Sequence, residues 1–71
     1  MPETLGNRLK ERRTELGLTQ AELADACGVT RKTVNTVENG VFVPSALLAL
    51  KMARALSVAP ADLFWIAEGE D

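Results

Sequence analysis

The stretch that decides the fold is residues 19–40, TQAELADACGVTRKTVNTVENG. It contains two short helical patterns joined by a turn. Thr19 and Glu22 have the spacing of a capping box, in which the hydroxyl and the carboxylate satisfy free backbone N–H groups at a helix start. Gly28 suits a left-handed turn, and Thr30 can cap a second helix. Such a helix pair can place its second helix in the major groove of DNA.

The second helical pattern has an apolar side and a polar side. Val34 and Val37 recur at the spacing of one helix face, so we expect them to point inward. Apart from Glu38, the remaining side chains are cationic, hydroxyl or amide groups: Arg31, Lys32, Thr33, Asn35, Thr36 and Asn39. Gly40 then suits a helix end.

Several positions together resemble the XRE-type helix-turn-helix family, the phage-repressor and Cro-like group of bacterial regulators. The matching residues are Gln20, Leu23, Ala24, Gly28, Val29, Val34 and the run 38–40. Residues 8–17 are similar to the family's first helix and residues 44–64 to its fourth and fifth helices, so the likeness covers about residues 5–65. The resemblance implies an all-α fold, a compact five-helix bundle.

We therefore expect a single domain over residues 1–71, with residues 68–71 frayed. Helices are predicted at 5–16, 20–26, 31–39, 46–56 and 61–66. Leu5, Leu9 and Leu16 would point inward from the first. Ser45 would cap the fourth helix, and Pro60 suits the start of the fifth.

The resemblance implies that the helix at 31–39 reads base edges. Arg31 and Lys32 can donate to guanine O6 and N7, and Thr36 can meet a thymine methyl group. Thr33 and Asn35 are secondary candidates for base contact. The alternative is an ordinary solvated helix face on which Arg31 and Lys32 add only charge.

The resemblance implies a phosphate contact from Gln20 at the second helix's N-terminus. Asn39, at the end of the third helix, and Thr30 are further candidates for phosphate contact. Gln20 is otherwise an ordinary exposed side chain, and Asn39 equally suits a role in stopping the helix. Val41 and Phe42 stand where many family members carry a basic residue, so one backbone contact is expected to be missing. Ser57 stands where a glycine often ends the fourth helix.

Arg13 and Glu38 match positions that form a structural pair in the family. Such a pair would lock the recognition helix against the first helix. The alternative is two independent surface charges. Cys27, at the end of the second helix, is interpreted as a small core residue.

Net charge is −2, which by itself argues mildly against nucleic-acid binding. Its distribution is uneven, because residues 1–54 carry all eight basic residues against six acids, whereas residues 55–71 carry four acids and no base. A weakly basic segment that contains the predicted DNA-reading helix, followed by an acidic tail, is compatible with DNA binding of modest non-specific affinity.

Apolar residues are in surplus late in the chain. Leu47 and Leu50 fall outside the inward stripe of the fourth helix, and Leu63, Phe64, Trp65 and Ile66 cannot all point inward from one short helix. We interpret Leu47, Leu50, Trp65 and Ile66 as a homodimer face. Scattered surface apolar residues are the alternative.

The sequence thus predicts a dimeric, sequence-specific regulator of transcription that binds double-stranded DNA, in a prokaryotic cytoplasm. An antitoxin with a toxin partner, or a protein-interaction module without DNA binding, are the competing functions. There is no His or Tyr, no cluster with metal-ligand spacing and no nucleophile paired with a base, so we expect no enzyme, metal or cofactor. No membrane span and no small-molecule effector are evident.

Overall fold

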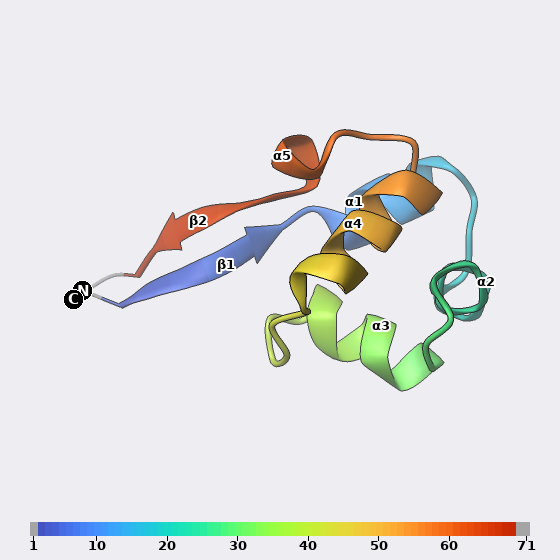
Figure 1. Ribbon diagram of the computed structural model, residues 1–71, viewed down its shortest axis with the longest axis horizontal. Helices are drawn as coiled ribbons and strands as arrows, with labels where there is room; N and C mark the ends of the chain where they lie inside the picture. Colours follow the sequence, from blue (N-terminus) through green and yellow to red (C-terminus); the bar gives the residue numbers. More distant parts are fainter. Residues whose placement is uncertain (1, 70–71) are drawn as a thin grey trace.

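The computed structural model of this protein describes residues 2–69. Over these residues a body of helices carries a two-stranded antiparallel ribbon, formed by segments from the two ends of the chain (Figure 1). In chain order the elements are β1 (Glu3–Asn7), α1 (Leu9–Glu15), α2 (Gln20–Cys27), α3 (Arg31–Glu38), α4 (Ala46–Ala55), α5 (Pro60–Leu63) and β2 (Phe64–Glu68). The ribbon extends away from the helices, so one part of the molecule is much thinner than the rest.

The helix-turn-helix itself follows the local signals in the sequence. Thr19 Oγ1 accepts from Glu22 N at 3.0 Å, and Glu22 Oε1 accepts from Thr19 N at 2.8 Å, which completes the predicted capping box. Gly28 ends α2 in the left-handed conformation with φ 69°. Thr30 Oγ1 then accepts from Thr33 N and caps α3. The predicted bounds of α2, α3 and α4 are each right to within a residue.

The core lies where the helices meet. Every helix contributes at least one buried apolar residue: Leu9 from α1, Leu23, Ala24 and Cys27 from α2, Val34 and Val37 from α3, Met52 and Ala53 from α4, Leu56 at its end, and Leu63 from α5. Leu47 and Leu50 are 63% and 54% exposed, as expected for residues outside the inward stripe of α4. Because Val34 and Val37 sit in this core, the opposite side of α3 must face solvent.

The prediction of an all-α fold is wrong at both ends of the chain. Leu5 lies in β1, and α1 begins only at Leu9, where Asn7 Oδ1 accepts from the Leu9 backbone N–H at 3.0 Å. The reason is pairing across the whole chain: Leu5 lies opposite Ile66, and Gly6 lies opposite Trp65. Leu16, expected inside, is 42% exposed.

The end of the chain differs from the prediction for the same reason. The fifth helix stops at Leu63 rather than at 66, and Phe64 turns into an extended strand with φ −128° and ψ 145°. Phe, Trp and Ile all favour strands when a partner strand is present. Glu68, expected to be frayed, belongs to β2, and Gly69 N donates to Pro2 O at 2.8 Å. Residues 70–71 of the predicted frayed tail lie outside the described residues.

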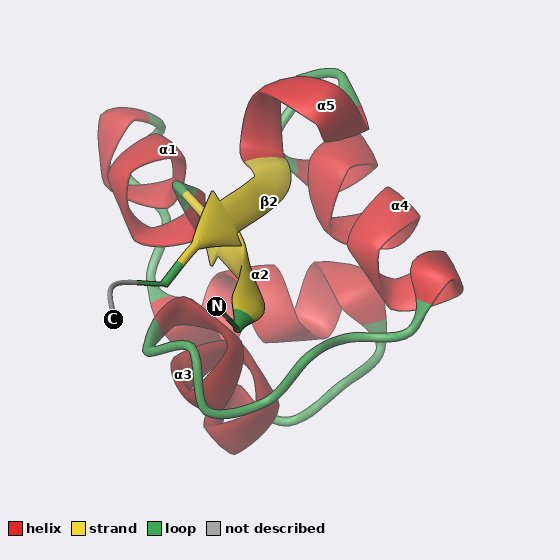
Figure 2. Ribbon diagram, turned by 90° about the vertical axis from the view of Figure 1, so that its left-hand side faces the viewer, coloured by secondary structure: helices red, strands yellow, loops and turns green. Residues whose placement is uncertain are grey.

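The arrangement of the ribbon over the body is clearest in end-on view. Figure 2 shows α1 to the left of the ribbon, α5 above it and the connection from α3 to α4 running below it. Over the described residues, every helix is too short or too polar to cross a membrane.

Candidate nucleic-acid interface

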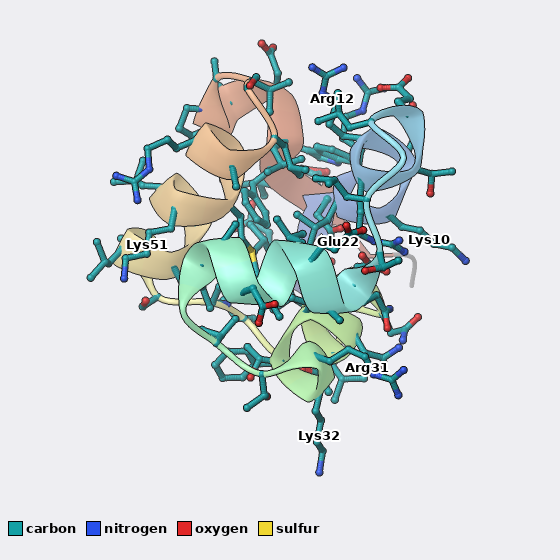
Figure 3. All side chains as sticks on the ribbon, turned by 90° about the vertical axis from the view of Figure 1, so that its right-hand side faces the viewer. Lys10, Arg12, Glu22, Arg31, Lys32 and Lys51 are labelled. Carbon is teal, nitrogen blue, oxygen red and sulfur yellow. The ribbon has the colours of Figure 1, made fainter. Side chains whose placement is uncertain are left out.

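The exposed side of α3 carries the predicted base-reading residues. Arg31, Lys32 and Asn35 are all exposed, whereas Val34 and Val37 are buried. Figure 3 shows Arg31 and Lys32 extending outward from the same end of α3, while Lys51 extends from α4 on another side. The two cations therefore share one outer surface, at the start of the helix.

Thr33 and Thr36 are only half exposed. The Thr36 hydroxyl donates to the Thr33 carbonyl oxygen at 2.9 Å, inside the helix. Its one hydroxyl hydrogen is used there, so the methyl group and the oxygen lone pairs remain for an outside contact. Both threonines border a shallow hollow of about 300 Å³, whose other wall includes Val41 and Phe42. The segment after α3 thus presents the apolar side chains of Val41 and Phe42 next to the predicted base-reading side of α3.

The N-terminus of α2 is the predicted phosphate site. Gln20 is the first residue of this helix, where the first backbone N–H groups have no acceptor inside the helix. Its side chain is already engaged, because Gln20 Nε2 donates to Glu38 Oε1 at 3.1 Å. That bond uses one of the two amide hydrogens and leaves the other for an anion.

Glu22 lies in the first turn of the same helix. The hydrogen bonds from the Thr19 backbone N–H and from its hydroxyl hold the pKa of the Glu22 carboxyl below its ordinary value. The carboxylate therefore stays ionised at neutral pH and stabilises the start of α2. It also places a negative charge near that helix end, which opposes an approaching phosphate.

Arg13 and Glu38 are brought together, although 25 residues separate them in the chain. Arg13 Nε lies 2.7 Å from Glu38 Oε2, and Arg13 Nη2 lies 3.2 Å from Glu38 Oε1. Arg13 Nη1 also donates to the Leu18 carbonyl oxygen at 2.8 Å. The Glu38 side chain is only 3% exposed, so the pair is almost fully removed from water. One carboxylate at the end of α3 thus holds side chains from α1 and α2.

The remaining phosphate candidates make bonds within the fold. Asn39 Nδ2 donates to the Asn35 carbonyl oxygen at 3.0 Å, which is the geometry of a helix stop. The Thr30 hydroxyl caps α3 and lies 3.1 Å from the Thr33 hydroxyl. Cys27 is 3% exposed, and this burial raises the pKa of its thiol against the opposing effect of the Lys51 and Arg54 charges. Cys27 is therefore an inert core residue, as predicted.

Known proteins share this sequence pattern and this arrangement of helices. A family model described as helix-turn-helix matches residues 9–63, the span of all the helices and their core. The chain belongs to the XRE-type helix-turn-helix family. Several of its curated relatives are named as uncharacterised HTH-type transcriptional regulators. The resemblance drawn from residues 19–40 and their surroundings is thereby confirmed.

Three individual proteins show how close the likeness is. The uncharacterised HTH-type transcriptional regulator YgzD of Bacillus subtilis is 47% identical over 62 residues, which cover 87% of this chain and 94% of YgzD. The restriction-modification controller protein C.AhdI from Aeromonas hydrophila aligns with a TM-score of 0.77 at 44% identity, covering 80% of this chain and 86% of that one. The P22 c2 repressor, solved in complex with a synthetic operator, aligns with a TM-score of 0.74 at 28% identity, covering 76% of this chain and 82% of that one.

One residue of this helix-turn-helix protein was missed by reasoning from the sequence. Asn7 was expected inside the first helix, with no role. In the structure its Oδ1 accepts from the backbone N–H of Leu9, the first residue of α1, and its Nδ2 donates to the Val37 carbonyl oxygen at 3.0 Å, so it ties the start of α1 to the last turn of α3. The available signal was that Asn is poor within a helix and good at its N-terminus.

The four predicted dimer residues are all exposed. Leu47, Leu50, Trp65 and Ile66 are exposed by 63%, 54%, 45% and 69%. They do not share one surface, however. Side chains alternate between the two faces of a strand. Trp65 and Ile66 are neighbours in β2, so they point to opposite faces of the ribbon.

Proposed function

We propose that this protein is a sequence-specific DNA-binding transcriptional regulator that places α3 in the major groove and acts as a homodimer on an inverted-repeat operator. The observation that carries the proposal is the position of α3. One side is anchored by Val34 and Val37, its end is anchored by Glu38, and its outer side presents Arg31 and Lys32. A rigid helix with exposed cations is what reading of base edges requires.

Within this proposal the side chains divide into two groups. Arg31, Lys32 and Thr36, with Thr33 and Asn35 beside them, contact base edges and set the preferred sequence. Gln20 contacts a phosphate and sets the register of the helix on the duplex, which affects all sequences alike. Asn39 and Thr30 already have partners within α3, so we assign them a smaller part.

The small number of cations on α3 is the reason for proposing a dimer. A single α3 with two cations neutralises few phosphates and reads few base pairs. Two copies related by a two-fold axis place their recognition helices about 34 Å apart, one turn of DNA, and so select an inverted repeat.

The direct test is selection of bound sequences from a random pool of duplex DNA, followed by a salt titration. We expect an inverted repeat to be enriched and affinity to fall steeply with salt. Replacing Arg31 and Lys32 together by Ala should abolish enrichment, whereas Lys51→Ala, on another side of the molecule, should leave the enriched sequence unchanged. Binding to no duplex at low salt would overturn the proposal.

The exposed apolar residues support two alternatives. An antitoxin that also binds a toxin, or an interaction module without DNA binding, would use such a surface for a different protein. Co-purification with a small toxic protein from the natural host would favour the antitoxin.

A further inference from the structure

The connection that follows α3 turns back against that helix. Gly40 adopts the left-handed conformation with φ 73°, and the chain reverses there. The backbone N–H groups of Val41 and Phe42 then both donate to the Thr36 carbonyl oxygen, at 2.9 and 3.2 Å. These two residues are therefore held next to α3 by hydrogen bonds rather than projecting freely into solvent.

The side chains at these two positions are apolar and open to solvent. Val41 is 77% exposed and Phe42 is 47% exposed. They border the shallow hollow of about 300 Å³, whose other members are Thr30, Lys32, Thr33 and Thr36. All four of these other residues are assigned to DNA contact in the proposed function. The apolar surface of the connection is thus continuous with the proposed DNA interface.

A phosphate group is a poor partner for this part of the surface. The valine side chain has no hydrogen-bond donor, and the backbone N–H groups of Val41 and Phe42 are already bonded to Thr36. Exposed apolar surface gains free energy when another apolar group covers it. Among the base edges that the major groove presents, the apolar group is the C5-methyl group of thymine.

We propose that Val41, with Phe42 beside it, packs on the C5-methyl group of a pyrimidine base and so extends the base-reading surface beyond α3. The inference rests on the proposed function, because it requires α3 to lie in the major groove. Within residues 2–69, Lys32 is the one charged residue that borders the hollow, so most of its wall suits a methyl group. A segment in which the sequence indicated only a missing backbone contact thereby acquires a part in sequence preference.

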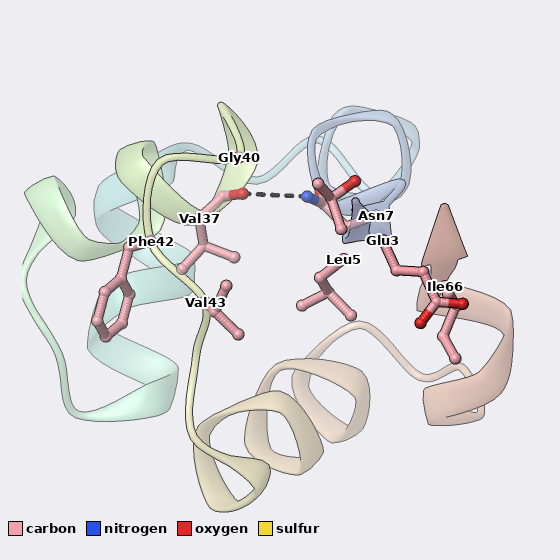
Figure 4. Close-up of a pocket in the computed structure, with 9 residues that line it drawn as sticks. Glu3, Leu5, Asn7, Val37, Gly40, Phe42, Val43 and Ile66 are labelled. Carbon is pink, nitrogen blue, oxygen red and sulfur yellow. Dashed lines mark hydrogen bonds between the residues drawn. The ribbon is translucent and has the colours of Figure 1, made fainter. Parts of the chain in front are cut away.

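Val43 provides a matched control two residues along the same connection. It is 66% exposed, so alanine there removes the same two methyl groups from a similarly exposed position. Figure 4 shows Val43 turned toward Leu5 of the ribbon, while the Phe42 ring lies on the opposite side of the connection. Val43 accordingly borders a groove of about 430 Å³ beside the ribbon rather than the hollow at α3.

The test removes single methyl groups from the DNA. The operator selected from the random pool is synthesised with each thymine in turn replaced by uracil, which lacks the C5-methyl group and keeps the O4 acceptor. At one thymine in each half-site we expect uracil to weaken equilibrium binding of the wild type by about threefold to fivefold, as burial of one methyl-sized group implies. Val41→Ala should bind the thymine and uracil duplexes equally, whereas Val43→Ala should respond as the wild type does.

A second arm methylates the operator cytosines at C5 and shows which pyrimidine supplies the methyl group. A gain in wild-type affinity that Val41→Ala lacks would identify 5-methylcytosine, and the uracil effect would identify thymine. Because Val41 is exposed, thermal denaturation should show Val41→Ala to be as stable as the wild type.

Two results would overturn the inference while leaving DNA binding intact. One is a Val41→Ala variant that keeps every methyl effect, with Thr36→Ser losing it instead, which would assign the methyl group to Thr36 alone. The other is a Val41→Ala variant that weakens all sequences alike while no methyl group matters, which would place Val41 against the sugar-phosphate backbone. A wild type that binds no duplex would overturn the proposed function and this inference with it.

Discussion

Arg13 and Glu38 form a two-bond ion pair between α1 and the end of α3, with Arg13 Nε 2.7 Å from Glu38 Oε2. The Arg13 side chain is 12% exposed and the Glu38 side chain is 3% exposed. The Glu38 carboxylate also accepts a hydrogen bond from Gln20. One buried carboxylate at the end of α3 thus binds side chains from both α1 and α2.

Removing either partner should destabilise the fold strongly. Arg13→Leu leaves the Glu38 carboxylate buried without its cation, and we expect a loss of about 3–5 kcal/mol in the free energy of unfolding. In a double-mutant cycle with Glu38→Leu, measured by urea denaturation, the double variant should lose clearly less than the two single losses combined. The exposed pair Arg12–Glu15 is the control, with an expected coupling below about 1 kcal/mol. Additive losses at Arg13 and Glu38 would mean that the two charges act separately.

Gln20 should affect stability and DNA affinity in different ways. Gln20→Ala removes its hydrogen bond to Glu38, which should lower stability by about 0.5–1.5 kcal/mol. It should also weaken binding to operator and random DNA by the same factor, because a phosphate contact carries no sequence information. Gln20→Glu sets a second carboxylate beside Glu38 and should destabilise more than Ala does. Loss of preference for particular base pairs would show that Gln20 reads bases instead.

Replacing Arg31 or Lys32 should change the preference of the protein for particular DNA sequences. Arg31→Ala and Lys32→Ala should each relax discrimination at particular base pairs by about 1–3 kcal/mol for a good bidentate contact. Both side chains are exposed, so thermal stability should hardly change. Competition binding against a set of single-base operator variants measures the effect. If both variants lose affinity equally for every sequence, the two residues supply only charge.

Glu22 gives a prediction about pH. Its pKa is lowered in the folded protein by hydrogen bonds from Thr19, so ionised Glu22 stabilises the fold above its unfolded pKa of about 4.3. That contribution is lost as pH falls through the lowered folded pKa. Glu22→Gln keeps an acceptor for the Thr19 N–H but cannot ionise. The wild type should therefore be more stable than Glu22→Gln at pH 7, and the difference should shrink toward pH 3 in urea denaturation. A difference that stays constant would mean that the charge is unimportant.

Asn7→Asp separates the two bonds of the residue that links α1 to α3. An aspartate still accepts from Leu9 N but cannot donate to the Val37 carbonyl oxygen, so we expect a loss of about 1–3 kcal/mol. Asn39→Asp is the matched control, because it also removes an amide-to-carbonyl bond, at an exposed site. Thermal denaturation compares the two. Equal losses would show that the Asn7 contact has no special importance.

The residues whose partners lie within a few positions were predictable from the sequence. Thr19 with Glu22, Thr30 with Thr33 and Ser45 with Leu48 all bond across three residues, so their spacing alone sets the helix starts. The same holds for the alternation of Val34 and Val37 with the cations of α3, which already identified the outer face of that helix.

The ribbon and the shared carboxylate needed the tertiary structure. Leu5 looked helical from its neighbours, and it became a strand residue because Ile66, near the other end of the chain, supplied the partner backbone. Gln20 and Arg13 meet at Glu38 only once α1, α2 and α3 have packed. Local sequence thus determined where α2, α3 and α4 begin and which side of α3 is polar. Contacts between distant segments decided where α1 begins and where α5 ends, because a strand acquires its hydrogen bonds from a segment that its own neighbours do not specify.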